Sequence, residues 1–442
     1  MSIVRVFALR AAVVACFLPF VSPARSQQIS DLDRQRAQQM LKTVGDDVRK
    51  HYYDPKFHGV DLDKEIAASK QRIEKVNSMN MALSNIAAAL DALDDSHTFF
   101  LPTQHAMHHE YGWEYQMVGE HCFITEVRPK SDADAKGVKP GDELLSINGI
   151  VPTHDTTWKL QYIFGVLRPQ VGLRLALQDP AGKQRTVDAM ARIRETKRVT
   201  DLSGANGAGD IWSLIREQET YEHQMRARYA EYGEPLIVMK VPEFEFSPSE
   251  VGAMMDKVRR HTALILDLRG NPGGSVETLE YLLGAMFDKD VKIADRVGRK
   301  ENQPQTAKAS HNPFTGKLLV LLDSRSVSAA ELFARVMQIE KRGVVLGDRS
   351  SGSVMESKHY SEKTGADTVI FYGVSVTDAD LIMTDGESLE HAGVTPDEIV
   401  LPTAADLASG RDPVLSRAAG LLGVKISPAD AGKLFPYEWT AE

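Results

Sequence analysis

Cysteine is nearly absent from this chain, whose 442 residues include only Cys16 and Cys122. One pair cannot build the disulfide framework of a small secreted domain, so the fold must depend on a hydrophobic core. After the first 30 residues no apolar run approaches the roughly 18 residues that span a bilayer, so a membrane span is not expected. Basic runs are also lacking and the formal net charge is −9, so nucleic acid is not expected as a partner.

The chain begins with the pattern of a secretory signal peptide. Arg5 and Arg10 give a positive start, an apolar run follows, and a small-x-small site ends at Ser26. This pattern predicts cleavage after Ser26 and export to the periplasm or the medium. A buried N-terminal helix or strand is the alternative. Cleavage removes Cys16 and leaves Cys122, whose apolar surroundings are typical of a small core residue.

Hydrophobic patterns divide the rest of the chain into parts. Apolar residues at helical spacing predict helices between residues 30 and 93, and short β-rich runs separated by turns follow from about 108 to 195. A linker and a charged connector helix come next. From residue 234 on, strand patterns such as PLIVMKVP and ALILDLRG alternate with helical ones, which predicts an α/β core with a buried sheet.

The β-rich part resembles a PDZ domain. The resemblance is carried by the run AKGVKPGDELLSING at residues 135–149. PDZ domains bind an extended peptide, often a C-terminus, by adding it as a strand beside a helix. The resemblance therefore implies a peptide-binding site, although the carboxylate-binding loop, expected near Tyr111 to Val118, has no clean signature.

Three loops have residues suited to catalysis. The NPGG turn at 271–274 follows a predicted strand, and its glycines expose backbone N–H groups that can hold an anion. Ser328 lies at a predicted helix start, where free N–H groups favour negative charge, although Ser-x-x-Glu is also an ordinary capping box. His97 is one of 13 histidines and suits general base catalysis. Because metal-ligand spacings and a dinucleotide fingerprint are missing, no metal and no cofactor are expected.

From about residue 40 to 400 the chain resembles the family of C-terminal processing peptidases and tricorn-core proteases. The resemblance rests on the order of the PDZ-like run and five other motifs: DVRKHYYDP, DSHTFFLP, LILDLRGNPGG, LVLLDSRSVSAAELFA and HAGVTPDEIV. It implies that Ser328 is the nucleophile of a serine peptidase. It also implies that the N–H groups of Gly274 and Ala329 form the oxyanion hole.

The general base separates two branches of this family. The branch with a Ser–Lys dyad has its lysine after a glycine, 25 positions beyond the nucleophile, where this chain has Ser353. The tricorn branch instead uses a histidine that is oriented by an adjacent serine and a distant glutamate. These correspond to His97, Ser96 and Glu390. The resemblance therefore implies a Ser-His-Ser-Glu tetrad, whose members act as a Ser–His–acid unit regardless of chain order.

The implied protein is a multidomain α/β serine endopeptidase that is exported and cleaves protein or peptide substrates, with the PDZ domain recruiting or gating them. Its core resembles the crotonase-like (ClpP/crotonase) fold. Two alternatives remain: a catalytically silent member of the same fold that binds peptides or hydrophobic ligands, and a crotonase-like acyl enzyme, which the PDZ-like run and the export signal disfavour. The expected parts are a signal peptide (1–26), a helical region contributing to the active site (27–105), the PDZ domain (106–195), a linker and connector helix (196–233), the α/β core (234–425) and a C-terminal tail (426–442).

Overall fold

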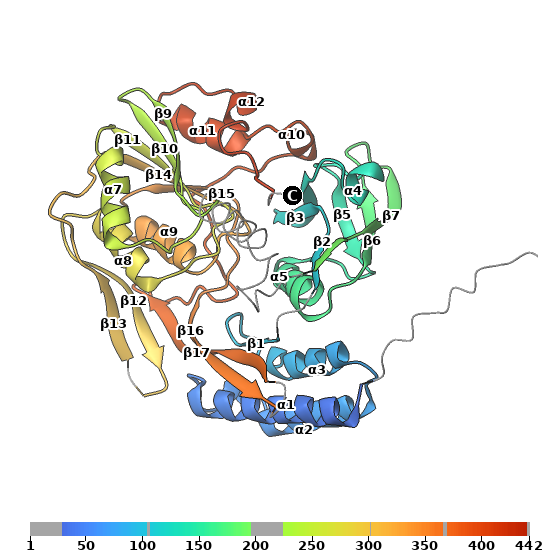
Figure 1. The fold of residues 1–442 in the computed structure, drawn as a ribbon. Coiled ribbons are helices and arrows are strands. Elements are labelled where there is room, and N and C mark those ends of the chain that lie inside the picture. Colours follow the sequence, from blue (N-terminus) through green and yellow to red (C-terminus); the bar gives the residue numbers. More distant parts are fainter. Residues whose placement is uncertain (1–28, 104–106, 196–223, 301, 366–368, 440–442) are drawn as a thin grey trace, which may run out of the picture.

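The computed structural model describes residues 29–103, 107–195, 224–300, 302–365 and 369–439. The predicted signal peptide and most of the predicted linker and connector helix lie outside these ranges. The end of that predicted helix is wrong, because Arg228–Tyr232 form a strand, β9, that pairs with the core sheet. A helical layer, a small β-sheet domain and an α/β core follow one another along the chain and lie around a common centre (Figure 1). Within the described ranges, no helix is both long enough and apolar enough to cross a membrane.

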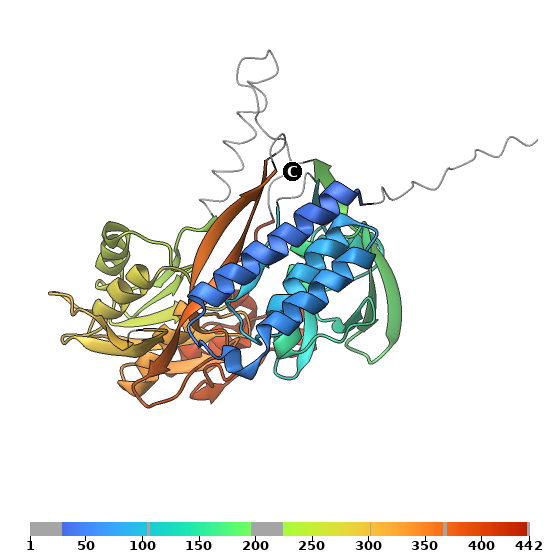
Figure 2. The ribbon, with the colours of Figure 1, turned by 90° about the horizontal axis from the view of Figure 1, so that it is seen from below.

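The helical layer consists of three helices that lie side by side against a long β-hairpin (Figure 2). Ser30, Asp61 and Ser78 cap them, each accepting a backbone N–H from three residues further on. Their apolar faces are buried in one cluster with β17, as the helical periodicity predicts. The elements are α1 (Asp31–His51), η1 (Phe57–Gly59), α2 (Leu62–Lys75), α3 (Met79–Asp91) and the short strand β1 (Phe99–Leu101).

The second part is an antiparallel sheet of five strands in the order β3-β4-β5-β6-β7, with β3 at one edge. Cys122 is buried in its core, as the sequence predicts, and burial raises the pKa of its thiol. The elements are β2 (Met107–Glu110), β3 (Trp113–Val118), β4 (His121–Val127), α4 (Asp132–Ala135), β5 (Glu143–Ile147), α5 (His154–Tyr162), η2 (Ile163–Leu167), β6 (Gly172–Gln178), β7 (Gln184–Met190) and β8 (Arg192–Glu195).

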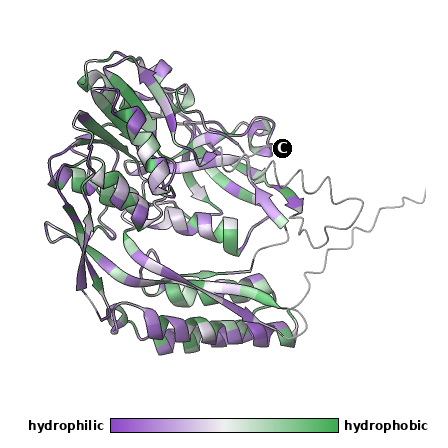
Figure 3. Ribbon diagram, turned by 60° about the vertical axis from the view of Figure 1, so that its left-hand side comes forward, coloured by the Kyte–Doolittle hydropathy of each residue, from purple (hydrophilic) through white to green (hydrophobic). Residues whose placement is uncertain are grey.

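The α/β core is built on a sheet of six strands in the order β18-β15-β14-β11-β10-β9, in which only β9 runs antiparallel to its neighbour. Hydrophobic residues concentrate on these strands (Figure 3). The elements of this layer are β9 (Arg228–Tyr232), β10 (Leu236–Lys240), α7 (Pro248–Val258), β11 (Ala263–Asp267), α8 (Val276–Gly284), β14 (Lys317–Leu322), α9 (Ala329–Ile339), β15 (Val344–Gly347), β18 (Glu398–Ile399), α10 (Ala404–Ala408), α11 (Pro413–Leu421) and α12 (Pro428–Ala431).

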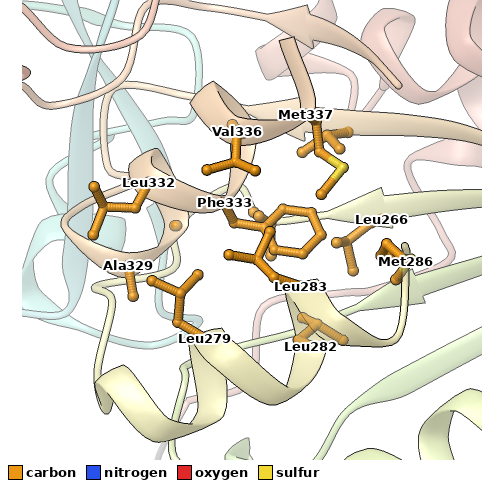
Figure 4. Close-up of a cluster of buried hydrophobic side chains, with 14 of the residues drawn as sticks. Leu266, Leu279, Leu282, Leu283, Met286, Ala329, Leu332, Phe333, Val336 and Met337 are labelled. Atoms are coloured by element: carbon orange, nitrogen blue, oxygen red, sulfur yellow. The ribbon is translucent and has the colours of Figure 1, made fainter. Parts of the chain in front are cut away.

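Both faces of this sheet are covered, because successive residues of a strand point to opposite sides. Leu264 and Leu266 of β11 pack under α7, α8 and α9, whereas Ile265 faces α11 and α12. Figure 4 shows Phe333 of α9 close to Leu283 of α8 and to Leu266, which fixes the position of α9 on the sheet.

A second sheet joins the core to the helical layer. β16 (Met355–Thr364) and β17 (Ile370–Met383) form a long antiparallel pair, and β17 also pairs with β12 (Val291–Gly298), which pairs with β13 (Asn302–Ala307). Strand β1 pairs with β17, with Phe99 opposite Ser375. The segment just before β1 is therefore attached directly to the core, although almost 300 residues separate the two in sequence.

Candidate active site

Ser328 is the N-cap residue of α9, directly after the loop that follows β14. Its backbone has φ 54° and ψ −115°, a left-handed conformation that is strained for any residue other than glycine. Its N–H donates to the Ser353 carbonyl oxygen at 3.0 Å and to Glu331 Oε2 at 2.9 Å. The surrounding hydrogen bonds thus hold the serine in a conformation that the backbone alone disfavours.

The NPGG turn lies against Ser328 because β11 and β14 are parallel neighbours, whose carboxyl ends meet at one edge of the sheet. A Cβ on Gly273 would lie 2.8 Å from Ser328 Cβ, so only glycine fits there. Gly274 bridges to Phe244. No acceptor within the described part of the chain takes the N–H of Gly274 or of Ala329.

Ser96, His97 and Glu390 form a hydrogen-bonded chain. The Ser96 hydroxyl donates to Glu390 Oε2 at 2.9 Å, its N–H donates to Oε1 at 2.9 Å, and its oxygen lies 2.7 Å from His97 Nδ1. Since the hydroxyl proton goes to the carboxylate, we assign Nδ1–H as the donor to Ser96. Nε2 of the neutral imidazole then carries a lone pair that can accept a proton.

Asp95 fixes the turn that carries these residues. Its Oδ1 accepts the N–H groups of His97 at 2.8 Å and Thr98 at 2.9 Å, and the Thr377 hydroxyl of β17 at 2.6 Å. Burial lowers the pKa of the His97 imidazole, and the Asp95 charge opposes this shift. Burial also raises the pKa of the Glu390 carboxyl, against hydrogen bonds from Ser96 and Val354 that lower it.

One peptide unit connects this chain to Ser328. The carbonyl of Ser353 accepts the Ser328 N–H, and the N–H of the next residue, Val354, donates to Glu390 Oε2 at 2.7 Å. Ser328 and His97 are not hydrogen-bonded to each other in the described structure. The structure therefore brings Ser96, His97 and Glu390 into contact and holds Ser328 beside the same loop.

Glu331 stabilises the loop that contains Ser353. Its buried carboxyl group accepts four hydrogen bonds, from the N–H groups of Ser328, Gly352 at 2.7 Å and Ser353 at 3.1 Å, and from the Ser350 hydroxyl at 2.6 Å. Burial raises its pKa to about 7, and the hydrogen bonds oppose the shift. Sequence reasoning treated Glu331 only as part of a capping box, and that Ser-x-x-Glu spacing is the one signal by which it could have been found.

Ser353 is the residue that the family resemblance aligns with the lysine of the Ser–Lys branch. Its hydroxyl lies 3.0 Å from the Ser351 hydroxyl. The partly buried Lys240 is engaged elsewhere, because its ammonium donates to the Arg269 carbonyl oxygen at 2.8 Å and lies 3.6 Å from Asp267 Oδ1.

Comparisons with known proteins match two parts of this chain to known families. Residues 236–400 match the family model described as peptidase family S41, and residues 104–163 match the PDZ domain. These matches confirm the resemblance of the chain to the C-terminal processing peptidases and to PDZ domains.

Two curated relatives come from bacteria. The chain is 25% identical over 297 residues to the carboxy-terminal processing protease CtpB of Bacillus subtilis, an alignment that covers 64% of this chain and 56% of CtpB. It is 23% identical over 336 residues to the tail-specific protease of Haemophilus influenzae, covering 72% of this chain and 41% of the relative. The chain thus spans about half the length of these relatives. Mature CPAF complexed with lactacystin has a similar fold, with a TM-score of 0.62, 16% identity, and coverage of 85% of this chain and 96% of CPAF.

We expect Glu331→Gln to change how stability depends on pH. Because the folded state raises the pKa of Glu331 from 4.5 to about 7, it binds a proton more tightly than the unfolded chain, so this group makes the wild type less stable as pH rises from 4.5 to 7. The variant lacks this loss of stability, which amounts to about 3 kcal/mol in the free energy of unfolding. Urea unfolding of both proteins at pH 5 and pH 8 measures the difference.

Glu250→Gln is the matched control. Glu250 occupies the same position in the capping box of α7, where its carboxylate accepts the Ser247 N–H at 2.8 Å, and it is exposed. Its burial is slight and its pKa is lowered, so this variant should not reduce the slope. Equal slopes in wild type and Glu331→Gln would contradict the account of Glu331.

Proposed function

We propose that this chain is an exported serine endopeptidase that cleaves protein or peptide substrates through Ser328, His97, Ser96 and Glu390. The observation that carries the proposal is the hydrogen-bonded chain from Glu390 through Ser96 to His97, tied by the Ser353–Val354 peptide to a strained serine at a helix N-terminus. The peptidase family S41 match supports the reaction class.

In the proposed mechanism, His97 Nε2 removes the Ser328 hydroxyl proton as the oxygen attacks the peptide carbonyl. Ser96 and Glu390 keep the proton on Nδ1 and stabilise the imidazolium that forms. The N–H groups of Gly274 and Ala329 bind the oxyanion, and losing one such donor typically costs about 3–4 kcal/mol of transition-state stabilisation. His97 then protonates the leaving amine, and water hydrolyses the acyl-enzyme with the same base.

The PDZ domain is proposed to recruit or gate the substrate. The edge strand β3, which has β4 as its one partner among the described strands and α5 close by, is where a peptide strand would add. We also propose that the core has a crotonase-like fold and that the domains have the limits expected from the sequence, except that the core begins with β9.

A silent binding protein is the second candidate. Ser353 in place of the dyad lysine favours it, since loss of a catalytic base is one route to such a protein. A fluorophosphonate probe distinguishes the two candidate functions, because only an activated Ser328 is labelled covalently.

Substitution of each proposed catalytic residue tests the mechanism. Ser328→Ala and His97→Ala should each abolish turnover of denatured casein, and Glu390→Gln should lower kcat by about 10²–10⁴-fold because the imidazolium loses its partner. Ser353→Ala is the matched control and should stay within about threefold of wild type, since in this mechanism its side chain does no chemistry.

Two outcomes decide against the tetrad. Robust turnover by purified His97→Ala would show that another group is the base. Absence of both turnover and probe labelling in the wild type would favour the silent binding protein. Circular dichroism of each variant shows whether a loss of rate is a loss of fold.

The rate should depend on pH through His97. Only the neutral imidazole accepts the serine proton, and burial lowers the pKa of His97 from its usual 6.5. The acid limb of kcat/KM is therefore expected to have its midpoint below pH 6.5, so that activity persists into mildly acidic solution. Because Glu331 also titrates near 7 beside Ser328, a midpoint at or above 7 in both the wild type and Glu331→Gln would contradict this assignment.

Export is proposed on the N-terminal sequence. Cleavage after Ser26 predicts a mature chain that starts at Gln27. Intact mass of the protein recovered from a periplasmic fraction checks this, and a retained or lipidated N-terminus would refute it.

A further inference from the structure

The last described residues cross from the α/β core to the PDZ domain. Their start is fixed on the core by Arg228 of β9, which donates to the Pro436 carbonyl oxygen at 3.1 Å and lies 3.5 Å from Glu438 Oε1. The same guanidinium lies 5.7 Å from the centre of the Phe435 ring. Figure 1 shows this stretch running from α12 to the side of β3.

The other end of the segment contacts the PDZ domain. The Tyr437 hydroxyl donates to Glu114 Oε1 of β3 at 3.2 Å. Arg128, at the end of β4, lies 5.6 Å from the centre of the Trp439 ring. The two aromatic rings pack edge to face with centres 4.8 Å apart, so they form one unit.

The strand that receives the tail also contacts the segment that leads to Ser328. Glu114 Oε2 lies 4.0 Å from Arg325 Nη1, and the Ser324 hydroxyl donates to the Met117 carbonyl oxygen at 2.6 Å. Both core residues belong to the loop between β14 and α9. Tail, PDZ strand and nucleophile loop are therefore joined through β3.

The contact from Ser324 lies at the free edge of β3. The Met117 carbonyl accepts a hydrogen bond from the Ser324 hydroxyl of the core. A peptide added to this edge would compete for the same carbonyl group. The docked position of the PDZ domain thus covers part of the edge.

We propose that residues 435–439 form a latch that holds the PDZ domain on the nucleophile loop, with its peptide-binding edge partly covered. We expect opening of the latch to loosen the contacts of β3 with the loop, because Glu114 and Met117 both belong to β3. The Gly119 N–H, directly after β3, still donates to Asp348 Oδ2 of the core at 2.7 Å. The latch is a property of the folded chain and does not depend on whether the protein cleaves peptides.

Hydrogen exchange of the full chain tests the latch. In a Ser328→Ala background, which prevents self-cleavage, Tyr437→Phe should speed amide exchange in residues 113–119 and 323–328 about tenfold, because a hydrogen bond to a carboxylate is lost. A chain ending at Pro436 should speed it further.

Tyr281→Phe is the matched control. The Tyr281 hydroxyl also donates to a glutamate, Glu277, at 3.2 Å, but on the surface of α8, so exchange in the two segments should not change. Unchanged exchange in the shortened chain would overturn the proposal. Faster exchange spread evenly over the whole chain would also overturn it, because the tail would then stabilise the fold in general and not this contact.

Discussion

The buried carboxyl group of Glu331 is the constraint on which the site depends. It accepts hydrogen bonds from the backbone of Ser328 on one side and from Gly352 and Ser353 on the other. An unpaired carboxylate in such a place would be costly, so the two loops and the carboxyl group stabilise one another. This network maintains the strained backbone of Ser328. The loop that contains Gly352 and Ser353 also contacts Glu390, because the N–H of Val354 donates to its carboxylate.

The remaining geometry follows from where strands end. Parallel β11 and β14 bring the NPGG turn and Ser328 to one sheet edge, and close packing leaves room only for glycine between them. The proposed base has a different origin, because His97 belongs to the turn before β1, whose pairing with β17 places it at the core. The site is thus assembled from two layers, with Asp95 bonded to Thr377 at their junction.

The sequence predicts the part of the site at the sheet edge better than the part around His97. Helices, the PDZ-like sheet and the strand–turn–helix pattern around residues 271–274 and 328 follow from hydrophobic periodicity and glycine positions, because those signals are local. The contact between Ser96 and Glu390 spans 294 residues, and no spacing rule reaches that far, so it rested on family resemblance alone. The buried network of Glu331 could not be predicted from the sequence, because the exposed Glu250 has the same capping-box pattern without such a network.

A serine at position 353 is consistent with this arrangement. At position 353 the backbone already serves two partners, since its carbonyl holds Ser328 and its N–H holds Glu331. The loop therefore keeps its shape without a lysine side chain at position 353. In the proposed mechanism the group that accepts the serine proton, His97, comes instead from the helical layer. A base at His97 has a further consequence, because its position depends on the β1–β17 pairing and on the packing of α1–α3 against β17. Correct docking of the helical layer and assembly of a complete catalytic unit are then the same structural event.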